Sequence, residues 1–376
     1  MGYRKRTLLP IGIHMNAGAV YMVQLEQTES TVEAVAKASK QFALALVGVA
    51  VVAADGPDEG TLPPSASSEF SPEPYEEACR FVRETIESSA FRGKNVVISL
   101  PPEHLVIQHV RLAPVPPDEL MAALLGELQG KLPFEPRDAV LGHIIAGTVT
   151  ESNETKQDVI VLAARRDVVE RYVSTVHRMG LSVVGVGLEP CAMCYPYLFA
   201  ATRAAATPSG PPVSMIIYLG VRVTHVAIVR GPDTTFVKGV EVGTDHLAEA
   251  IAADRHTSVH EAIALQAAWR EATGDEGSGE AVAAYNRIKS SLEHVVDEIK
   301  SCMRYHASLA RGAHIDRFLF VGPAARDRAL VRVIGAHLGV ACEVGNPLGA
   351  ILESGDLAAA EPELAVATGL SLFEAQ

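Results

Sequence analysis

The sequence has few cysteines, no long apolar run and no excess of positive charge, and each lack excludes a class of protein. Five cysteines in 376 residues argue against a disulfide scaffold and fit a reducing compartment. The net charge of −13 disfavours nucleic-acid binding, which needs clustered Lys and Arg. The longest apolar run, residues 42–54, is shorter than the ~20 residues that span a bilayer. We therefore expect no transmembrane segment and interpret this run as a buried strand or core segment.

Three further features bear on where the chain works and what it binds. No signal sequence opens the chain, which predicts a cytoplasmic protein. Arg4, Lys5 and Arg6 form a small basic cluster that could touch an anionic membrane, although a solvated N-terminus is the simpler interpretation. Cys191 and Cys194 form a Cys-x-x-Cys pair without a second pair of ligands at metal spacing, so a redox or metal role is disfavoured.

The order of predicted elements indicates two large units and a smaller one. Residues 8–25 and 213–230 each read as strand, turn and strand, which indicates an internal duplication. A stretch rich in Pro, Ser and Gly at 207–212 marks the joint between the halves. Residues 102–180 read as strand, helix, strand, strand and helix, the pattern of a compact α+β unit. The longest helical pattern covers 281–309, and residues 56–74 predict a surface loop.

Residues 11–25, 128–136, 161–190, 298–305 and 345–347 form an ordered set of five stretches. Together they resemble the PilM family of actin-like proteins from type IV pilus assembly and, more loosely, the cell-division protein FtsA. Residues 11–25 resemble the first phosphate hairpin, and 128–136 the end of a helix in the inserted small domain. Residues 161–190 resemble the return to the first domain, 298–305 a Glu-Ile-x-Arg-Ser-x-x-Tyr helix, and 345–347 an Ala-Asn-Pro turn. No single stretch is specific, but the ordered set covers almost the whole chain.

The resemblance implies an α/β fold, namely the two-lobed actin-like ATPase fold (ribonuclease H-like and duplicated) with an inserted small α+β subdomain. The first lobe would comprise residues 1–101 and 181–206, and the inserted subdomain residues 102–180. The second lobe would comprise residues 213–376, with residues 246–315 as its helical subdomain.

The same resemblance places a nucleotide site at Asn16, Gly18, Gly220 and Gly322. In the actin-like fold, glycine hairpins present backbone N–H groups to the phosphates and two aspartates position Mg²⁺. Here His14 and Tyr218 stand at the two aspartate positions, and a lone histidine is more often structural than catalytic. We therefore expect a pseudo-ATPase with no catalytic residue and no metal ligand. Binding of ATP and Mg²⁺ without hydrolysis stays open.

The function that the resemblance implies is a cytoplasmic scaffold, peripheral to the inner membrane, which docks the N-terminal peptide of a PilN-like membrane protein. Leu128, Leu132 and Phe134 are expected to wall the groove for this peptide; alternatively they pack inside the small domain. The competing hypotheses are an actin-like ATPase or sugar-kinase relative, and a GspL-like component of type II secretion. Other pilus assembly proteins are expected partners, while self-association and the identity of the partner stay open.

Overall fold

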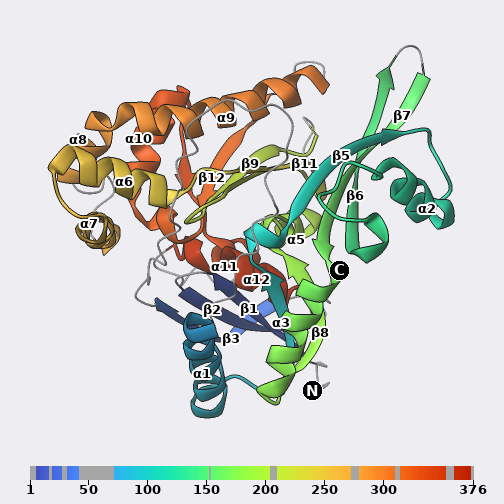
Figure 1. The fold of residues 1–376 in the computed structure, drawn as a ribbon, viewed down its shortest axis with the longest axis horizontal. Helices are drawn as coiled ribbons and strands as arrows, with labels where there is room; N and C mark the ends of the chain where they lie inside the picture. The colour runs from blue at the N-terminus through green and yellow to red at the C-terminus, as the bar shows by residue number, and fades with distance from the viewer. Residues whose placement is uncertain are drawn as a thin grey trace, which may run out of the picture.

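The computed structural model describes residues 6–16, 19–27, 32–41, 72–151, 154–203, 210–271, 279–309, 314–352 and 360–373. Gly18, the apolar run at 42–54 and most of the loop predicted at 56–74 lie outside these residues. Three β-sheets organise the described chain (Figure 1).

The first sheet has the strand order β3-β2-β1-β4-β8. Its strands are β1 (Thr7–Asn16), β2 (Ala19–Gln27), β3 (Val32–Gln41), β4 (Asn95–Leu100) and β8 (Ser182–Leu188). The first three strands are antiparallel neighbours, and β4 and β8 then add in parallel. The helices that follow its strands are α1 (Pro72–Ser88), α3 (Arg166–Arg178), α4 (Glu189–Ala192) and α5 (Tyr195–Arg203).

The second sheet repeats this arrangement in the order β11-β10-β9-β12-β13. Its strands are β9 (Val213–Leu219), β10 (Thr224–Arg230), β11 (Asp233–Val240), β12 (Arg317–Val321) and β13 (Glu343–Val344). Its central strand β9 is apolar along almost its whole length and buried throughout, as a strand covered on both faces should be. The equal order and the equal mix of antiparallel and parallel neighbours confirm the predicted duplication and the actin-like fold.

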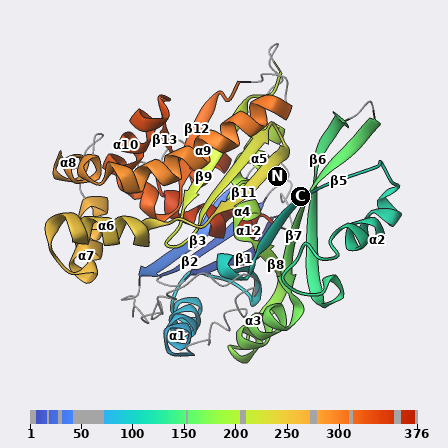
Figure 2. The same cartoon turned by 45° about the horizontal axis from the view of Figure 1, so that its top comes forward.

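Helices of the second lobe cover one face of this sheet (Figure 2). They are α6 (Thr244–Arg255), α7 (Val259–Glu271), α8 (Gly279–Arg287), α9 (Lys289–Leu309) and α10 (Arg328–Leu338). The helix expected at 281–309 is therefore divided at Ile288, where the Ser291 N–H bonds the Ile288 carbonyl three residues back. This shorter bond tightens the helix locally, while the expected buried stripe continues through Leu292, Val295 and Ile299.

The third sheet, of order β5-β7-β6, forms the inserted unit. It consists of β5 (Val106–Leu112), β6 (Ala139–Glu151) and β7 (Glu154–Arg165), with α2 (Pro117–Glu127) packed on one face. Its other face meets the lobes, because Ile160 and Leu162 join a core cluster with Cys191 and Met193. All of these strands lie within the range 102–180 predicted for the insertion.

The last helices of the chain return to the first sheet. They are α11 (Pro347–Ile351) and α12 (Ala365–Ser371). Elsewhere in the described chain there are short 3-10 helices, namely η1 (Pro102–His104), η2 (Pro136–Asp138), η3 (Pro323–Arg326) and η4 (Pro362–Leu364). Helix α12 packs so closely on β1 that a Cβ added at Gly12 would lie 2.0 Å from the Ala367 carbonyl oxygen. The end of the chain, predicted to belong to the second lobe, thus packs against the sheet of the first.

Candidate functional site

The structure brings the two hairpins expected to hold a nucleotide face to face between the lobes. Asn16 ends β1, Gly220 follows β9 and Gly322 follows β12. The rings of His14 on β1 and Tyr218 on β9 lie 6.0 Å apart between centroids. The ends of β1 and β9 therefore meet across the interlobe boundary, while Gly18 lies outside the described residues.

A buried carboxylate with a histidine on either side occupies this boundary. Glu189 begins α4, at the end of the last strand of the first sheet, and is 2% exposed. The Nε2 of His14 on β1 lies 2.9 Å from one of its oxygens, and the Nε2 of His225 on β10 lies 3.2 Å from the other. One carboxylate thus links a strand of each lobe.

The electrostatics of this cluster favour an ionised Glu189. Burial alone would raise the pKa of this carboxyl, but hydrogen bonding to His14 and His225, together with their charge, lowers the pKa to about 2. His14 Nε2 makes a hydrogen bond to the carboxylate, whereas His225 Nε2 lies at ion-pair distance from the second oxygen without hydrogen-bond geometry. The carboxylate is therefore engaged with the protein itself, and Mg²⁺ would have to displace a buried histidine to reach it.

Tyrosine rings fill the space on either side of the cluster. Tyr21 stacks on His14 with ring centroids 5.7 Å apart, and Tyr218 is fully buried, so desolvation and the nearby Glu189 raise the pKa of its hydroxyl. Tyr218 also reaches Gly322: a Cβ added at this glycine would lie 2.7 Å from the tyrosine ring. The ring therefore lies against the position that would receive adenosine.

The backbone N–H groups at the expected glycines already have partners within the chain. Gly220 N–H bonds the Val223 carbonyl at 3.2 Å, and Gly322 N–H bonds the Pro362 carbonyl at 2.8 Å. No group of three or more His, Cys, Asp or Glu side chains arranged to hold a metal is found in the described part of the chain. The residues present do not fit a Mg²⁺–nucleotide in the manner of the actin-like fold.

Sequence reasoning found His14 and Tyr218 but missed Glu189 and His225. His14 and Glu189 are 175 residues apart, and no local pattern connects positions that distant. Glu189 follows β8, whose side chains are mostly only partly buried, so no burial pattern in the sequence singled it out.

The Cys-x-x-Cys pair is buried beside this cluster. Cys191 and Cys194 lie in the core, and burial raises the pKa of the Cys191 thiol to about 12 and that of Cys194 well above its usual value. Cys194 Sγ–H donates to the Pro190 carbonyl at 3.3 Å. Both residues are therefore held as thiols, which are poor nucleophiles and poor metal ligands.

The predicted partner-binding residues lie at the core of the inserted unit. Leu128 is fully buried and Leu132 nearly so, beneath α2 and the third sheet, and Phe134 packs partly against the same cluster. This corrects the expectation that all three wall a groove, since Leu128 and Leu132 fill the interior. Phe134 alone retains enough exposure to contact a partner.

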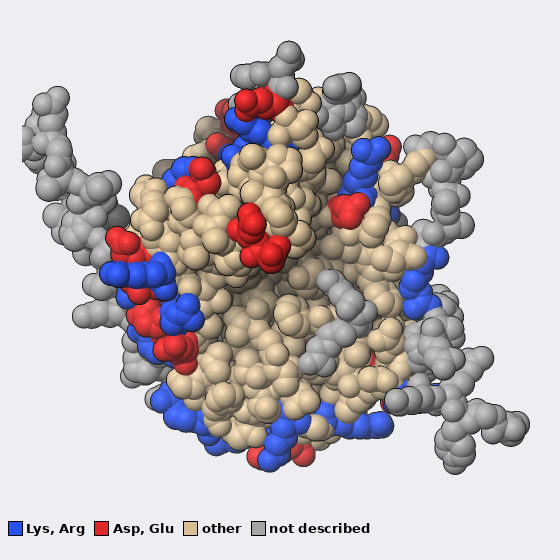
Figure 3. All heavy atoms as spheres, turned by 90° about the vertical axis from the view of Figure 1, so that its right-hand side faces the viewer, with Lys and Arg blue, Asp and Glu red and all other residues tan. Residues whose placement is uncertain are grey.

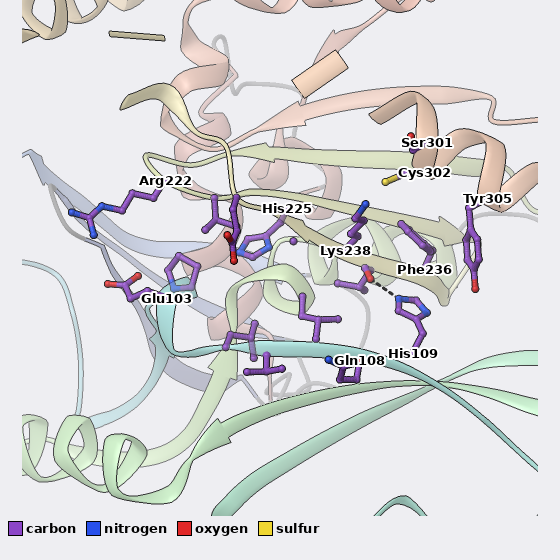
Figure 4. A pocket seen from close by; sticks show the side chains of 18 of the residues that line it. Glu103, Gln108, His109, Arg222, His225, Phe236, Lys238, Ser301, Cys302 and Tyr305 are labelled. Atoms are coloured by element: carbon purple, nitrogen blue, oxygen red, sulfur yellow. Dashed lines mark hydrogen bonds between the residues drawn. The ribbon is translucent and has the colours of Figure 1, made fainter. Parts of the chain in front are cut away.

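A groove of about 1080 Å³ lies between β5 of the inserted unit and β11 of the second lobe (Figure 4). An aromatic cluster closes one end: the Phe236 ring lies 5.3 Å from both His109 and Tyr305. His109 Nε2–H also donates to the Val237 carbonyl at 2.8 Å, while Glu103 lies at the other end. The cluster fixes the inserted unit against the second lobe.

A second junction, between the inserted unit and the first lobe, exposes apolar side chains. Strands β6 and β8 are outermost among the described strands of their sheets. Val140 on β6 and Val184 on β8 are each 39% exposed, and Phe373 is 37% exposed. The Phe373 ring lies over β8, 2.9 Å from where a Cβ at Gly185 would stand. The face of the molecule on the side of the inserted unit is hollowed and carries few charges at its centre (Figure 3).

Fold and site together define a two-lobed actin-like protein whose nucleotide positions are altered. Residues 62–375 match the family described as type IV pilus assembly protein PilM, and the chain belongs to this family. No helix in the described part of the chain is both long and apolar enough to cross a membrane.

The chain is also similar to solved structures, of which the first supports the fold. The PilM–PilN type IV pilus biogenesis complex matches with a TM-score of 0.72 and 20% identity, over 96% of this chain and 97% of that chain. The ethanolamine utilization protein EutJ from Carboxydothermus hydrogenoformans matches with a TM-score of 0.49 and 13% identity, over 98% and 90%. The activator of 2-hydroxyisocaproyl-CoA dehydratase from Clostridium difficile matches with a TM-score of 0.41 and 11% identity, over 97% and 93%. Among curated proteins no sequence matches the chain.

Proposed function

We propose that this protein is a scaffold of type IV pilus assembly that docks a short cytoplasmic segment of a PilN-like inner-membrane protein. Membership of the PilM family supports the pilus role. The full-length structural likeness to a PilM–PilN complex supports the partner. Docking of this kind holds the protein on the cytoplasmic side, next to the inner membrane. The alternatives of a kinase relative and a type II secretion component have no comparable support.

The junction of β6 and β8 is the docking site that the geometry favours. An extended peptide can add to the open edge of an outermost strand through its backbone while its apolar side chains enter neighbouring pockets. Both strands at this junction are outermost, and Val140, Val184 and Phe373 supply exposed apolar surface there. Phe134 stays a predicted contact at the margin of the inserted unit.

The test compares two substitutions of equally exposed apolar residues. Val184→Asp places a charge at the proposed junction, whereas Met121→Asp does the same on α2, where the side chain is 38% exposed. Binding of a fluorescent peptide from the cytoplasmic N-terminus of the PilN-like protein is measured by anisotropy. We expect Val184→Asp to weaken binding about tenfold or more, because the charge must be desolvated, and Met121→Asp to bind as wild type.

Thermal unfolding of both variants separates a lost contact from a lost fold. Unchanged binding by folded Val184→Asp would remove β8 from the interface. Phe134→Asp then tests the inserted unit. Lost peptide binding with an unchanged unfolding temperature supports a contact, whereas loss of both binding and thermal stability shows a role in the core.

We further propose that the interlobe site is degenerate and does not hydrolyse ATP. The support is that Glu189 is engaged by His14 and His225 and that Tyr218 lies against Gly322. Phosphate release with ATP and Mg²⁺ is expected to stay at the level of a protein-free blank. Turnover above the blank that disappears in folded Glu189→Gln would show a working active site and refute this proposal.

A further inference from the structure

Basic side chains gather at one edge of the first sheet. Strands β1, β4 and β8 are parallel neighbours, so all three begin at this edge. Arg6 directly precedes β1, and Lys94 directly precedes β4 with Arg92 two residues earlier. Arg178 ends α3, four residues before β8 begins. The topology thus brings together charges that are far apart in the sequence.

The backbone at this edge is held in place by specific bonds. The Ser182 N–H donates to the Lys94 carbonyl at 2.8 Å, which ties the starts of β4 and β8 together. The buried Gln24 side chain accepts from the Arg92 N–H and donates to its carbonyl, each at 2.8 Å. The loop that carries Arg92 and Lys94 is therefore a fixed surface.

The cations of this edge are exposed and mostly unneutralised. Arg92, Lys94 and Arg178 are exposed, and no ion pair joins them to an acid within the residues that the structure describes. Arg178 donates to Thr175 Oγ1 at 2.8 Å, and Arg6 pairs with Glu26 at 3.1 Å.

The acids nearest in the sequence are Glu84 and Glu87, which lie toward the end of α1. They offset part of the charge of the edge. Lys and Arg side chains are also seen along the lower margin of the molecule (Figure 3), although the whole chain carries a charge of −13.

The helix dipole accounts for only one of these cations. Arg178 ends α3, where a positive charge is stabilised by the unpaired carbonyls of the last turn. Arg92 and Lys94 lie in a loop after α1 has ended, beyond the reach of this effect. The helix dipole therefore explains the position of Arg178 but not that of Arg92 or Lys94.

We propose that this basic edge contacts the anionic lipid surface of a membrane. Clustered Lys and Arg next to a negatively charged leaflet bind through additive, salt-sensitive attraction. The acidic remainder of the chain is repelled by the same surface, so the edge orients the protein on it. This contact is independent of the proposed protein partner, and its test contains only this protein and lipid.

The experiment is co-sedimentation of the full chain with vesicles of phosphatidylcholine alone or mixed with phosphatidylglycerol. Wild type should sediment with the mixed vesicles at low salt, and much less with neutral vesicles or at high salt. The triple variant Arg92→Glu, Lys94→Glu, Arg178→Glu should lose binding on the order of tenfold or more, since each cation near the surface contributes about a fivefold factor.

The matched control reverses the same number of charges on α9, which lies at the top of Figure 1, away from α1 and α3. It is the triple variant Lys289→Glu, Lys300→Glu, Arg304→Glu, which should sediment like wild type. Equal loss of vesicle binding in both variants would mean that net charge alone is responsible, and it would overturn the proposal. Wild-type sedimentation by the edge variant, or equal binding to neutral vesicles, would overturn it as well. Circular dichroism and thermal unfolding confirm that both variants are folded.

Discussion

Replacing Glu189 with glutamine should strongly destabilise the protein, although it changes only one oxygen to an amide nitrogen. The amide keeps the size of the side chain, so no cavity forms. It loses the negative charge between His14 and His225. In the wild type each histidine nitrogen faces a carboxylate oxygen, which can accept a hydrogen bond. In the variant one of these oxygens becomes an amide N–H₂, which is itself a donor, so one of the two contacts is lost.

The size of the effect follows from the pKa of the carboxyl. Its pKa falls from an ordinary value of 4.5 to about 2 in the folded protein, which corresponds to about 3 kcal/mol of stability at neutral pH. The group is fully buried, so solvent screening does not reduce this figure. Breaking a buried ion pair by removing one partner typically costs about 3–5 kcal/mol, which agrees.

The assay is urea unfolding of wild type and Glu189→Gln at several pH values. A carboxyl with a lowered pKa contributes its full stability above the unfolded pKa of about 4.5 and loses it as the pH falls through about 2. The difference between the two proteins should therefore be largest near pH 7 and shrink toward pH 2. The control is Glu87→Gln, an exposed carboxylate on α1, which should unfold like wild type. Equal stability of Glu189→Gln and wild type at pH 7 would refute the ion-paired cluster.

Two further predictions concern residues around the same cluster. Gly322→Ala should destabilise the protein by about 2 kcal/mol or more in urea unfolding. The backbone there has φ +87°, and the new methyl group would lie 2.7 Å from the Tyr218 ring. Unchanged stability would contradict this prediction and would mean that the ring moves freely. Cys191 and Cys194 should resist iodoacetamide at pH 8 in the folded protein and react in urea, because burial raises their pKa; rapid labelling of the native protein, read by mass spectrometry, would contradict this.

Most of the fold was accessible from the sequence because it depends on local patterns repeated along the chain. The strand-turn-strand openings at 8–25 and 213–230 predicted the duplication, and the order of elements in 102–180 predicted the small sheet. Local pattern cannot show where a segment packs. The last helix follows the second lobe in sequence, yet Gly12 leaves room for it on the first sheet.

The site was only half accessible for the same reason. His14 and Tyr218 stood out because each occupies a hairpin position where the resemblance requires an acid. Glu189 and His225 follow no motif, and their roles arise only when α4 and β10 meet between the lobes. The apolar residues at the end of α2 predicted a buried face. Leu128 alone does not indicate whether this face packs on the third sheet or on a partner. Such pairings are set by tertiary contacts, which hydrophobic periodicity does not record.

The altered interlobe site has a consequence for how the proposed docking junction is held. In an actin-like fold a bound nucleotide contacts both hairpins and so sets the angle between the lobes. Here the Glu189 carboxylate contacts a histidine from each lobe, so the protein supplies that link itself. The inserted unit is fixed in turn by the aromatic cluster of His109 and Phe236. We therefore expect the proposed junction of β6 and β8 to be formed before a peptide arrives, so that less ordering is needed on binding.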